Sequence, residues 1–273
     1  MTPSPARLPT LFIPHGGGPW PFMEAAFGPP GMWDGLRDYL ASIPASLPVK
    51  PKAVLVISGH WETARPTVNV NPAPPLLFDY YGFPEHTYHL RYPAPGAPEL
   101  ASRVGALLRG ARFALDKERA RGFDHGVFIP FMLIYPDADM PILQMSLQAH
   151  APVATHLAIG RALAPLRDEN VLIVGSGMSY HNLREFFSPT EAARLPAARF
   201  DDWLTDAVET EDAAQREAKL RAWLDAPGAL ASHPTPEHLE PLFVVAGAAE
   251  ADHGKRAFHA DIAGKPISGF QFG

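Results

Sequence analysis

The sequence predicts an α/β protein: a single domain over residues 1–273, with a mainly parallel central sheet flanked by helices. Three observations support this fold class. First, short and unbroken apolar runs such as Val171–Val174 are typical of strands that are covered on both faces of a parallel sheet. Second, stretches with helical spacing of apolar residues alternate with these runs, as βα units require. Third, three of the runs end in a turn of small residues that carries a histidine, which predicts an active-site pocket at the strand carboxyl ends.

The strands are predicted from their apolar runs and from the turns that follow them. The first, Thr10–Ile13, leads into His15 and three consecutive glycines. The second, Ala53–Ile57, leads into His60, and the central run leads through Gly-Ser-Gly to His181. Further strands are expected at Val68–Val70, Arg112–Leu115, Pro141–Leu147 and Ile267–Phe272.

The helices are predicted from apolar spacing and from capping residues. A stripe of apolar residues at helical spacing predicts a helix over Met32–Ile43. Asp124 is a predicted N-cap of the apolar helix Val127–Ile134, with His125 in the first turn. The segment Thr235–His238 has the cap-then-proline form of a helix start. Further helices are expected at Glu99–Arg109, at Pro152–Leu166, from Ser188 to about Leu224, and through Leu242–Ala249.

The composition excludes several classes of protein. Because 47% of the residues are hydrophobic and 19% are charged, a sizeable core is available and global disorder is excluded. A formal charge of −6 without any basic block argues against nucleic-acid and membrane partners. The absence of cysteine excludes disulfides, thiolate metal sites and cysteine nucleophiles. With no secretory h-region and no apolar run approaching ~18 residues, a cytoplasmic location is expected.

A long segment, Pro66–Pro95, is rich in proline and aromatic residues. Loops of this length in a compact domain are usually functional or poorly ordered, and the aromatic content of this one favours packing against a pocket. Residues 20–23 are expected to form a short helix or lid over the first glycine turn. The candidate pocket walls are Trp20, Phe78, Tyr80 and Phe83, and for each of them core packing is the alternative role.

Five of the twelve histidines follow an apolar strand or lie at a predicted helix start: His15, His60, His125, His181 and His238. The positive end of a helix disfavours imidazolium, so a histidine there stays neutral and able to bind metal or accept a proton. Neutral imidazoles without thiolates suit Zn, Fe, Cu or Ni rather than Mg or Ca. The alternative is that His15 and His60 only cap strand ends.

The remaining histidines lack a preceding glycine turn, and for them we expect structural or surface roles. They are His86, His89, His150, His156, His233, His253 and His259.

Two other kinds of functional motif are not matched by the glycine turns of this sequence. Gly175-Ser176-Gly177 lacks the glycine spacing of a serine nucleophile elbow, and the Gly16–Gly18 turn is followed by no Gly-Lys-Ser/Thr, which argues against a nucleotide site.

Seven motifs with these residues occur in a fixed order: Ile13-Pro14-His15-Gly16, Ser58-Gly59-His60-Trp61, Tyr92-Pro93-Ala94-Pro95-Gly96, Gly122-Phe123-Asp124-His125-Gly126, Tyr135-Pro136-Asp137-Ala138-Asp139, His181-Asn182-Leu183-Arg184 and Thr235-Pro236-Glu237-His238. The series resembles the class III extradiol ring-cleavage dioxygenases, most closely their DOPA 4,5-dioxygenase-like branch. The resemblance covers almost the whole chain. One departure lies in the first turn, His-Gly-Gly-Gly-Pro-Trp, where many relatives have His-Gly-Ser-Pro.

The resemblance implies an α/β fold with a deep pocket and a mononuclear non-haem Fe(II), while relatives can also carry Zn. His15 and His60 match the two metal-binding histidines at strand ends, and His238 is the best match for the third ligand. Glu237 is the alternative, because related protocatechuate-cleaving enzymes use a glutamate near this point. His181 matches a pocket histidine that is either a further metal ligand or an acid/base, and His125 is expected beside the substrate.

The predicted function is therefore a metal-dependent extradiol dioxygenase that inserts O₂ into a catechol next to its two hydroxyl groups. In that reaction His125 or His181 takes a hydroxyl proton, a role that needs a neutral imidazole. A zinc-binding hydrolase or non-catalytic binder of the same fold is the alternative, as is a binding module whose histidines never meet. The departure in the first turn leaves the catechol itself open, and the oligomeric state is also left open.

Overall fold

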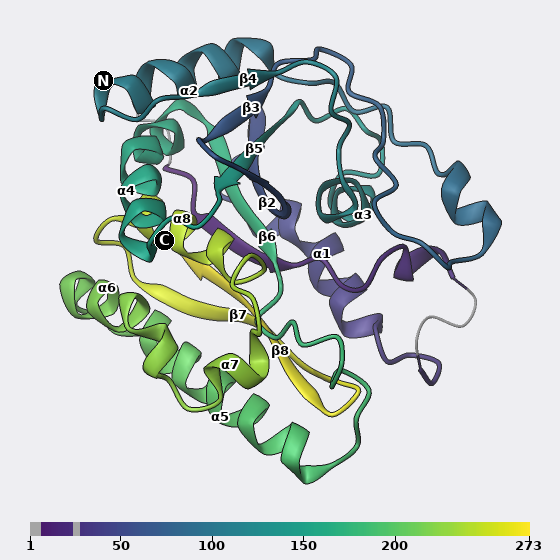
Figure 1. Ribbon diagram of the computed structural model, residues 1–273. Coiled ribbons are helices and arrows are strands. Elements are labelled where there is room, and N and C mark those ends of the chain that lie inside the picture. Colours follow the sequence, from purple (N-terminus) through teal and green to yellow (C-terminus); the bar gives the residue numbers. More distant parts are fainter. Residues whose placement is uncertain (1–6, 24–27) are drawn as a thin grey trace.

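The computed structural model describes residues 7–23 and 28–273 of the chain. Their centre is one mixed, mainly parallel sheet of eight strands in the order β4-β3-β5-β2-β6-β1-β8-β7 (Figure 1). The strands are β1 (Thr10–Pro14), β2 (Ala53–Thr63), β3 (Thr67–Asn69), β4 (Asp116–Glu118), β5 (Ile142–Gln148), β6 (Val171–Gly177), β7 (Gly254–Ile262) and β8 (Lys265–Phe272). The predicted α/β fold class is confirmed.

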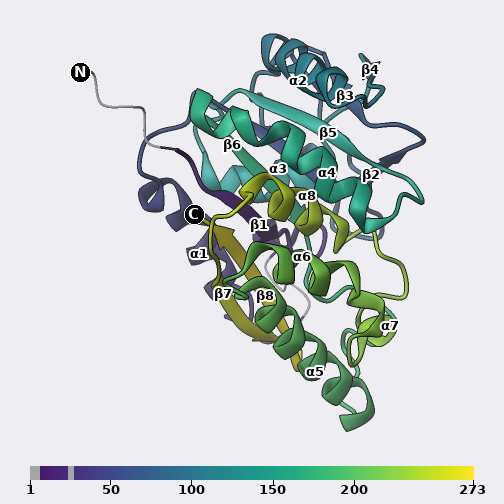
Figure 2. The ribbon, with the colours of Figure 1, turned by 90° about the vertical axis from the view of Figure 1, so that its left-hand side faces the viewer.

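Helices cover both faces of this sheet. They are α1 (Asp34–Ser46), α2 (Pro98–Gly110), α3 (His125–Ile134), α4 (Val153–Leu163), α5 (Glu191–Val208), α6 (Ala213–Arg221), α7 (Ala229–Ser232) and α8 (Glu240–Ala249). Short 3₁₀ helices lie at Trp20–Phe22, Glu85–His89, Ala164–Glu169 and Trp223–Asp225. Figure 2 shows α4 and α8 side by side over one face of the sheet. In the described part of the chain no helix is both long and apolar enough to cross a membrane.

Alternation along the strands divides the core in two. In β2, Leu55 and Ile57 join the apolar cluster beneath α2, α4 and α8, whereas Val54 and Val56 join the cluster beneath α1 and α3. This is the period of two that a strand imposes, with both faces apolar because both are covered. A continuous apolar run is the result, and it made the central strands predictable.

The centre of the sheet aligns the strand ends that carry the histidines. β1 and β2 both pair in parallel with β6, with Pro14 opposite Gly177 and Ser58 opposite Ser176. Parallel strands present their carboxyl ends at the same edge. His15 follows β1 directly, and His60 lies in the last part of β2, beyond the predicted end of that strand.

One predicted strand is absent, and one observed strand was not predicted. Arg112–Leu115 is not a strand, because α2 is followed by a turn with Arg112 in the left-handed region at φ 66°. The chain becomes extended only at β4, one residue beyond the predicted range. The antiparallel strand β7 was not expected, because it is an edge strand whose exposed positions carry charged residues and break the apolar pattern.

The prediction of one long helix from Ser188 to about Leu224 is also wrong, because the helix is not continuous. It is divided into α5, α6 and a 3₁₀ turn. The division follows from a cap: Asp212 accepts a hydrogen bond from the backbone N–H of Gln215 at 2.7 Å and starts α6 anew. The other predicted helices and strands are present, with ends shifted by a few residues or with a 3₁₀ extension.

Candidate active site

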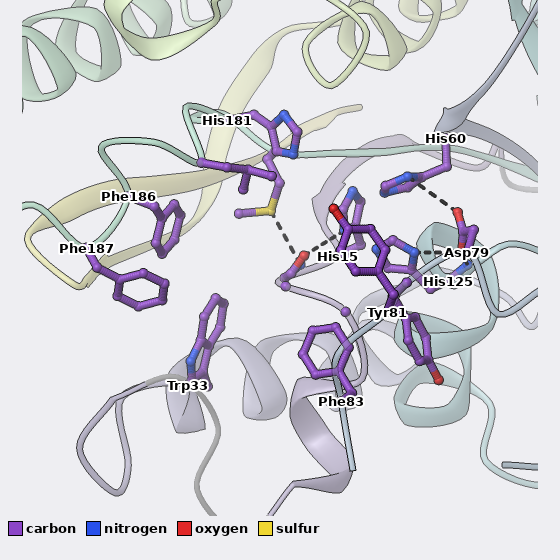
Figure 3. A pocket seen from close by; sticks show the side chains of 16 residues that line it. His15, Trp33, His60, Asp79, Tyr81, Phe83, His125, His181, Phe186 and Phe187 are labelled. Atoms are coloured by element: carbon purple, nitrogen blue, oxygen red, sulfur yellow. Dashed lines mark hydrogen bonds and ion pairs between the residues drawn. The ribbon is translucent and has the colours of Figure 1, made fainter. Parts of the chain in front are cut away.

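The five histidines singled out from the sequence meet at the carboxyl edge of the central strands. The ring centroid of His15 lies 4.8 Å from that of His60, 5.4 Å from His125 and 5.2 Å from His238. The His181 ring stacks on His238 at 3.3 Å. Four of the five rings also line one pocket, seen in Figure 3. His15 directly follows β1, His60 lies in β2, His181 lies in the loop after β6, His125 starts α3, and His238 lies in the turn before α8.

Three of these side chains turn ligand atoms toward one another. Nitrogens of His15, His60 and His238 all lie within 4.8 Å of each other. The Nε2 atoms of His60 and His238 are only 3.2 Å apart. His181 instead has a nitrogen within 4.8 Å of ligand atoms of Glu237 and His238, so it lies at the rim of the cluster rather than at its centre.

The hydrogen-bond partners of these rings fix which nitrogen faces the centre. His15 donates from Nδ1 to the carbonyl oxygen of Gly16 at 2.8 Å, and its buried Nε2 has no hydrogen-bond partner among the described residues. The Nδ1 of His238 lies 3.0 Å from Glu237 Oε1, and that of His60 lies 3.5 Å from a carboxylate oxygen of Asp79. With each Nδ1 facing an oxygen, the three Nε2 atoms are left to bind a metal ion, as in metal-binding histidines whose other nitrogen is held by an outer partner.

Burial keeps these imidazoles neutral. Loss of solvation lowers the pKa of His15, His60 and His238 well below the usual value, and their mutual proximity adds to this effect. Burial also lowers the pKa of His181 to about 4. A cluster of neutral imidazoles with one orphaned, buried nitrogen fits a transition-metal ion.

Glycines allow the segment with His238 to lie on the strand ends. A Cβ atom on Gly59 would come within 2.9 Å of the carbonyl oxygen of Glu237, and one on Gly177 would meet the carbonyl oxygen of His238. The predicted helix start at Thr235–His238 is wrong by a few residues, since these residues form a turn and α8 begins at Glu240. His238 is therefore held by a turn packed on two glycines.

Asp79 is a site residue that the sequence analysis missed. One of its carboxylate oxygens accepts the backbone N–H of His125 at 3.0 Å and lies 2.7 Å from His125 Nδ1. Burial opposes ionisation of this carboxyl, but the bonds to His125 and the nearby His60 outweigh it and lower the pKa of Asp79 to about 2. The available signal was an acidic residue inside an otherwise aromatic stretch of the long loop, next to Tyr80.

Asp124 occupies the predicted N-cap position of α3, but its side chain does not cap the helix. The buried carboxylate accepts hydrogen bonds from Ser58 Oγ at 2.7 Å, from Arg121 at 3.1 Å and from Gln144. Arg121 also donates to the carbonyl oxygen of His60 at 3.0 Å. The carboxylate thus joins β2, β5 and α3 beneath the histidines, instead of satisfying helix N–H groups.

The pocket has a volume of about 440 Å³. Of the candidate walls, Tyr80 and Phe83 line it, whereas Trp20 and Phe78 do not. Trp20 is fully buried and donates its indole N–H to the carbonyl oxygen of His15 at 2.9 Å, so it holds the first turn from behind. Further lining residues, which the sequence did not single out as walls, are Trp33, Tyr81, Met178, Leu183, Phe186 and Phe187.

The seven histidines assigned to structural or surface roles lie outside the pocket lining. Two of them are buried. His233 donates to the carbonyl oxygen of Ser179 at 2.9 Å, and His156 lies near Gln148 and Glu240. Their fully buried positions were not expected from the loop and helix-face locations, because burial here depends on α7 and α4 packing onto distant segments.

Comparison with known proteins agrees with this site. A family model described as the catalytic LigB subunit of aromatic ring-opening dioxygenase matches residues 11–270. The chain is 42% identical over 214 residues to the 4,5-DOPA dioxygenase extradiol of Beta vulgaris, which covers 77% of this chain and 78% of that protein. It is 39% identical over 248 residues to the protein of the same name from Escherichia coli K12, covering 90% and 86%.

Two further matches extend over nearly the whole chain. Dioxygenase tasH of Hapsidospora irregularis is 37% identical over 284 residues, covering 97% of this chain and 85% of that protein. The crystal structure of an uncharacterized protein from Escherichia coli K12 superposes with a TM-score of 0.78 at 30% identity, covering 98% of this chain and all of that one. The chain therefore belongs to the LigB family of aromatic ring-opening dioxygenases, and it is an extradiol ring-cleavage enzyme that acts on an aromatic substrate and O₂.

Proposed function

We propose that His15, His60 and His238 hold an iron(II) ion and that a catechol is cleaved beside it, next to its two hydroxyl groups. The single observation that carries the proposal is the inward arrangement of three Nε2 atoms, with the one of His15 buried and unpartnered among the described residues. Iron(II) in this position supplies a Lewis acid for the catechol oxygens and a path for electron density from the ring to O₂.

The arrangement favours His238 over Glu237 as the third ligand. The Nε2 of His238 faces His60, whereas the Glu237 carboxylate lies on the opposite, Nδ1 side of the same ring. Glu237 then acts as the partner that orients His238 and raises its basicity. An all-imidazole set also suits Zn(II). The test below therefore compares turnover of the Fe(II)-loaded and Zn(II)-loaded protein.

His125 is the proposed base for the catechol. Its Nδ1 donates to Asp79, which leaves Nε2 with a free lone pair that can take a hydroxyl proton. The ionised carboxylate stabilises the imidazolium that results, because the two groups are 2.7 Å apart. His125 also lines the pocket, so it can reach a bound substrate directly.

His181 is the proposed second acid/base. It lines the same pocket and stacks on His238, and its Nδ1 lies 3.6 Å from a carboxylate oxygen of Glu237. Because burial keeps this ring neutral at neutral pH, it can accept a proton and return it to an oxygen of the substrate. We assign it to proton transfer rather than to the metal, because it lies outside the central group of three nitrogens.

The test is oxygen uptake and visible absorbance after anaerobic reconstitution with Fe(II), using a panel of catechols. A yellow ring-opened product that forms with Fe(II) but not in a Zn(II)-loaded control is the expected result. The matched variants are His125→Gln and His259→Gln, a pocket histidine and an exposed histidine. The first should keep its metal and lose turnover, and the second should behave as the wild type.

Two outcomes would contradict the proposal. Protein that holds stoichiometric iron and consumes no oxygen with any catechol would exclude the proposed substrate class. Unchanged turnover of His125→Gln would remove His125 from proton transfer and leave His181 as the base.

A further inference from the structure

The pocket has two chemically different ends. The clustered histidines and Asp79 form one end, and the rings of Trp33, Phe186 and Phe187 lie together at the other (Figure 3). Trp33 and Phe186 are parallel to within 1° with centroids 6.4 Å apart, and Phe186 meets Phe187 edge-on at 5.1 Å. A catechol that reaches the histidines therefore extends its ring substituent along an aromatic wall.

Among the described residues, no lysine or arginine lines this pocket. Residues 1–6 and 24–27 contain none in their sequence. Asp79 is the acidic residue of the lining, and it lies at the histidine end. The pocket thus offers a substrate carboxylate no cationic partner, and it already contains one negative charge.

Three basic residues on other segments have their own partners or lie outside the lining. Lys265 is buried and donates to the carbonyl oxygen of Ser188 at 2.9 Å. Arg121 pairs with Asp124 at 3.1 Å beneath the histidines. Arg184 is exposed and is not part of the pocket lining.

These features determine which substituent is bound well. A carboxylate that enters an apolar pocket loses its hydration and finds no counter-charge, which is costly. An apolar substituent gains instead, by roughly fourfold in affinity for each methylene group that is buried. Aromatic substituents gain further from edge-to-face and offset contacts with the wall.

We propose that this enzyme selects catechols whose ring substituent is uncharged and apolar or aromatic, and that it discriminates against catechols with a carboxylate or zwitterionic side chain. The inference rests on the proposed function, because it assumes that the catechol ring lies at the histidine cluster. Trp33, Phe186 and Phe187 are the specificity-determining residues.

The experiment compares catechols with charged side chains and catechols with uncharged side chains. The pair is 3-(3,4-dihydroxyphenyl)propanoate and its methyl ester, with 4-propylcatechol and DOPA as further members, and the readout is kcat/KM of the Fe(II) enzyme. We expect the ester and 4-propylcatechol to exceed the acid and DOPA by at least about tenfold, the effect of a well-matched apolar contact. Anaerobic titration calorimetry on the same pair measures binding without turnover.

A variant with a new cation tests the cause of the preference. Leu183 lines the pocket and is 71% exposed, so Leu183→Arg places a positive charge at the rim without disturbing the core. It should raise the ratio of kcat/KM for the acid to kcat/KM for the ester by about two- to fivefold, as expected for one exposed ion pair. The matched control is Leu224→Arg, since Leu224 is similarly exposed at 59% but lies outside the lining.

The outcomes separate the two proposals. Equal or faster turnover of the acid or of DOPA would overturn the selectivity while leaving ring cleavage established. Binding of the ester over the acid without any cleavage would support the selectivity and reject the proposed function. An equal gain for the acid from Leu183→Arg and Leu224→Arg would show that the pocket rim does not control charge preference.

Discussion

Asp79 contacts two of the clustered histidines through its two carboxylate oxygens. One oxygen holds the ring and the backbone N–H of His125, and the other lies 3.5 Å from His60 Nδ1. A single loop residue therefore orients the proposed base and one proposed metal ligand together. Such outer partners of ligating and catalytic histidines are typically worth about 10–100-fold in affinity or activity.

Asp79→Asn tests this positioning role. The amide can still accept one hydrogen bond, but it lacks the charge that stabilises the His125 imidazolium. We expect kcat at saturating metal to fall by about 10–100-fold, while KM and metal content stay within about twofold. Asp38→Asn, at an exposed position of α1, is the control. A loss of metal in proportion to activity would instead assign Asp79 to metal retention.

His233 is a buried histidine outside the site. Burial lowers its pKa to about 3, and the hydrogen bond to Ser179 does not compensate for the loss of solvation. The unfolded chain binds a proton at this residue below about pH 6.5, whereas the folded chain stays neutral down to about pH 3. Stability is therefore unaffected above pH 6.5 and is lost as the pH falls toward 3, by up to ~1.4 kcal/mol per pH unit.

His233→Gln should flatten this dependence, because glutamine can donate to the same carbonyl oxygen without titrating. Between pH 6 and pH 4 we expect the variant to lose about 2 kcal/mol less unfolding free energy than the wild type. Urea unfolding at intervals of half a pH unit measures the difference. Parallel curves for the two proteins would contradict the assignment of this loss to His233.

At the scale of elements, α4 and α8 approach so closely that glycine is required at their contact. A Cβ atom on Gly160 of α4 would meet the carbonyl oxygen of Val244, and one on Gly247 of α8 would meet that of Leu157. This reciprocal contact holds α8 against β6 and β1, and so it sets the position of the turn that carries His238.

Gly160→Ala should destabilise the protein by about 1–3 kcal/mol, the usual cost of overpacking a tight interior contact. The matched control is Gly110→Ala at the end of α2, where the added Cβ meets nothing within 4 Å. Chemical denaturation gives both free energies. If the two alanine variants were equally stable, the close helix contact would not limit the packing.

At the scale of the whole molecule, the site joins segments from every part of the chain. The end of β1, β2, the loop after β6, α3 and the turn before α8 each contribute one histidine. A metal ion held by His15, His60 and His238, which are far apart in the sequence, is bound by the folded state alone. Binding energy of this kind appears as folding stability.

Metal removal should therefore lower the melting temperature. At a free metal concentration 1,000-fold above Kd, the stabilisation is about 4 kcal/mol, which for a domain of this size corresponds to roughly 8 °C or more. Differential scanning calorimetry before and after chelation measures it. The shift should vanish in His15→Asn and persist in His259→Asn, and a shift that persists in both would place the metal elsewhere.

Much of this protein was predictable from local pattern. The central strands have both faces covered, so their apolar runs are continuous, and the glycines and histidines that end them stand next to them in the sequence. The three histidines that follow apolar strands, His15, His60 and His181, were found for that reason. The edge strand β7 and the start of β4 were not predicted. The exposed strand β7 carries a mixed pattern of charged and apolar residues, and the left-handed turn at Arg112 before β4 leaves no local apolar signal.

The sequence by itself determined the α/β class, the strand ends that carry the site, the neutral histidine chemistry and, through its ordered motifs, the family. Only the tertiary structure decided which nitrogen of each ring faces the centre, that Asp79 holds His125 and that the far end of the pocket is aromatic and without cations. The physical reason is distance along the chain. Asp79, Trp33 and Phe186 lie in separate segments, and packing of those segments, rather than any local periodicity, brings their side chains to one pocket.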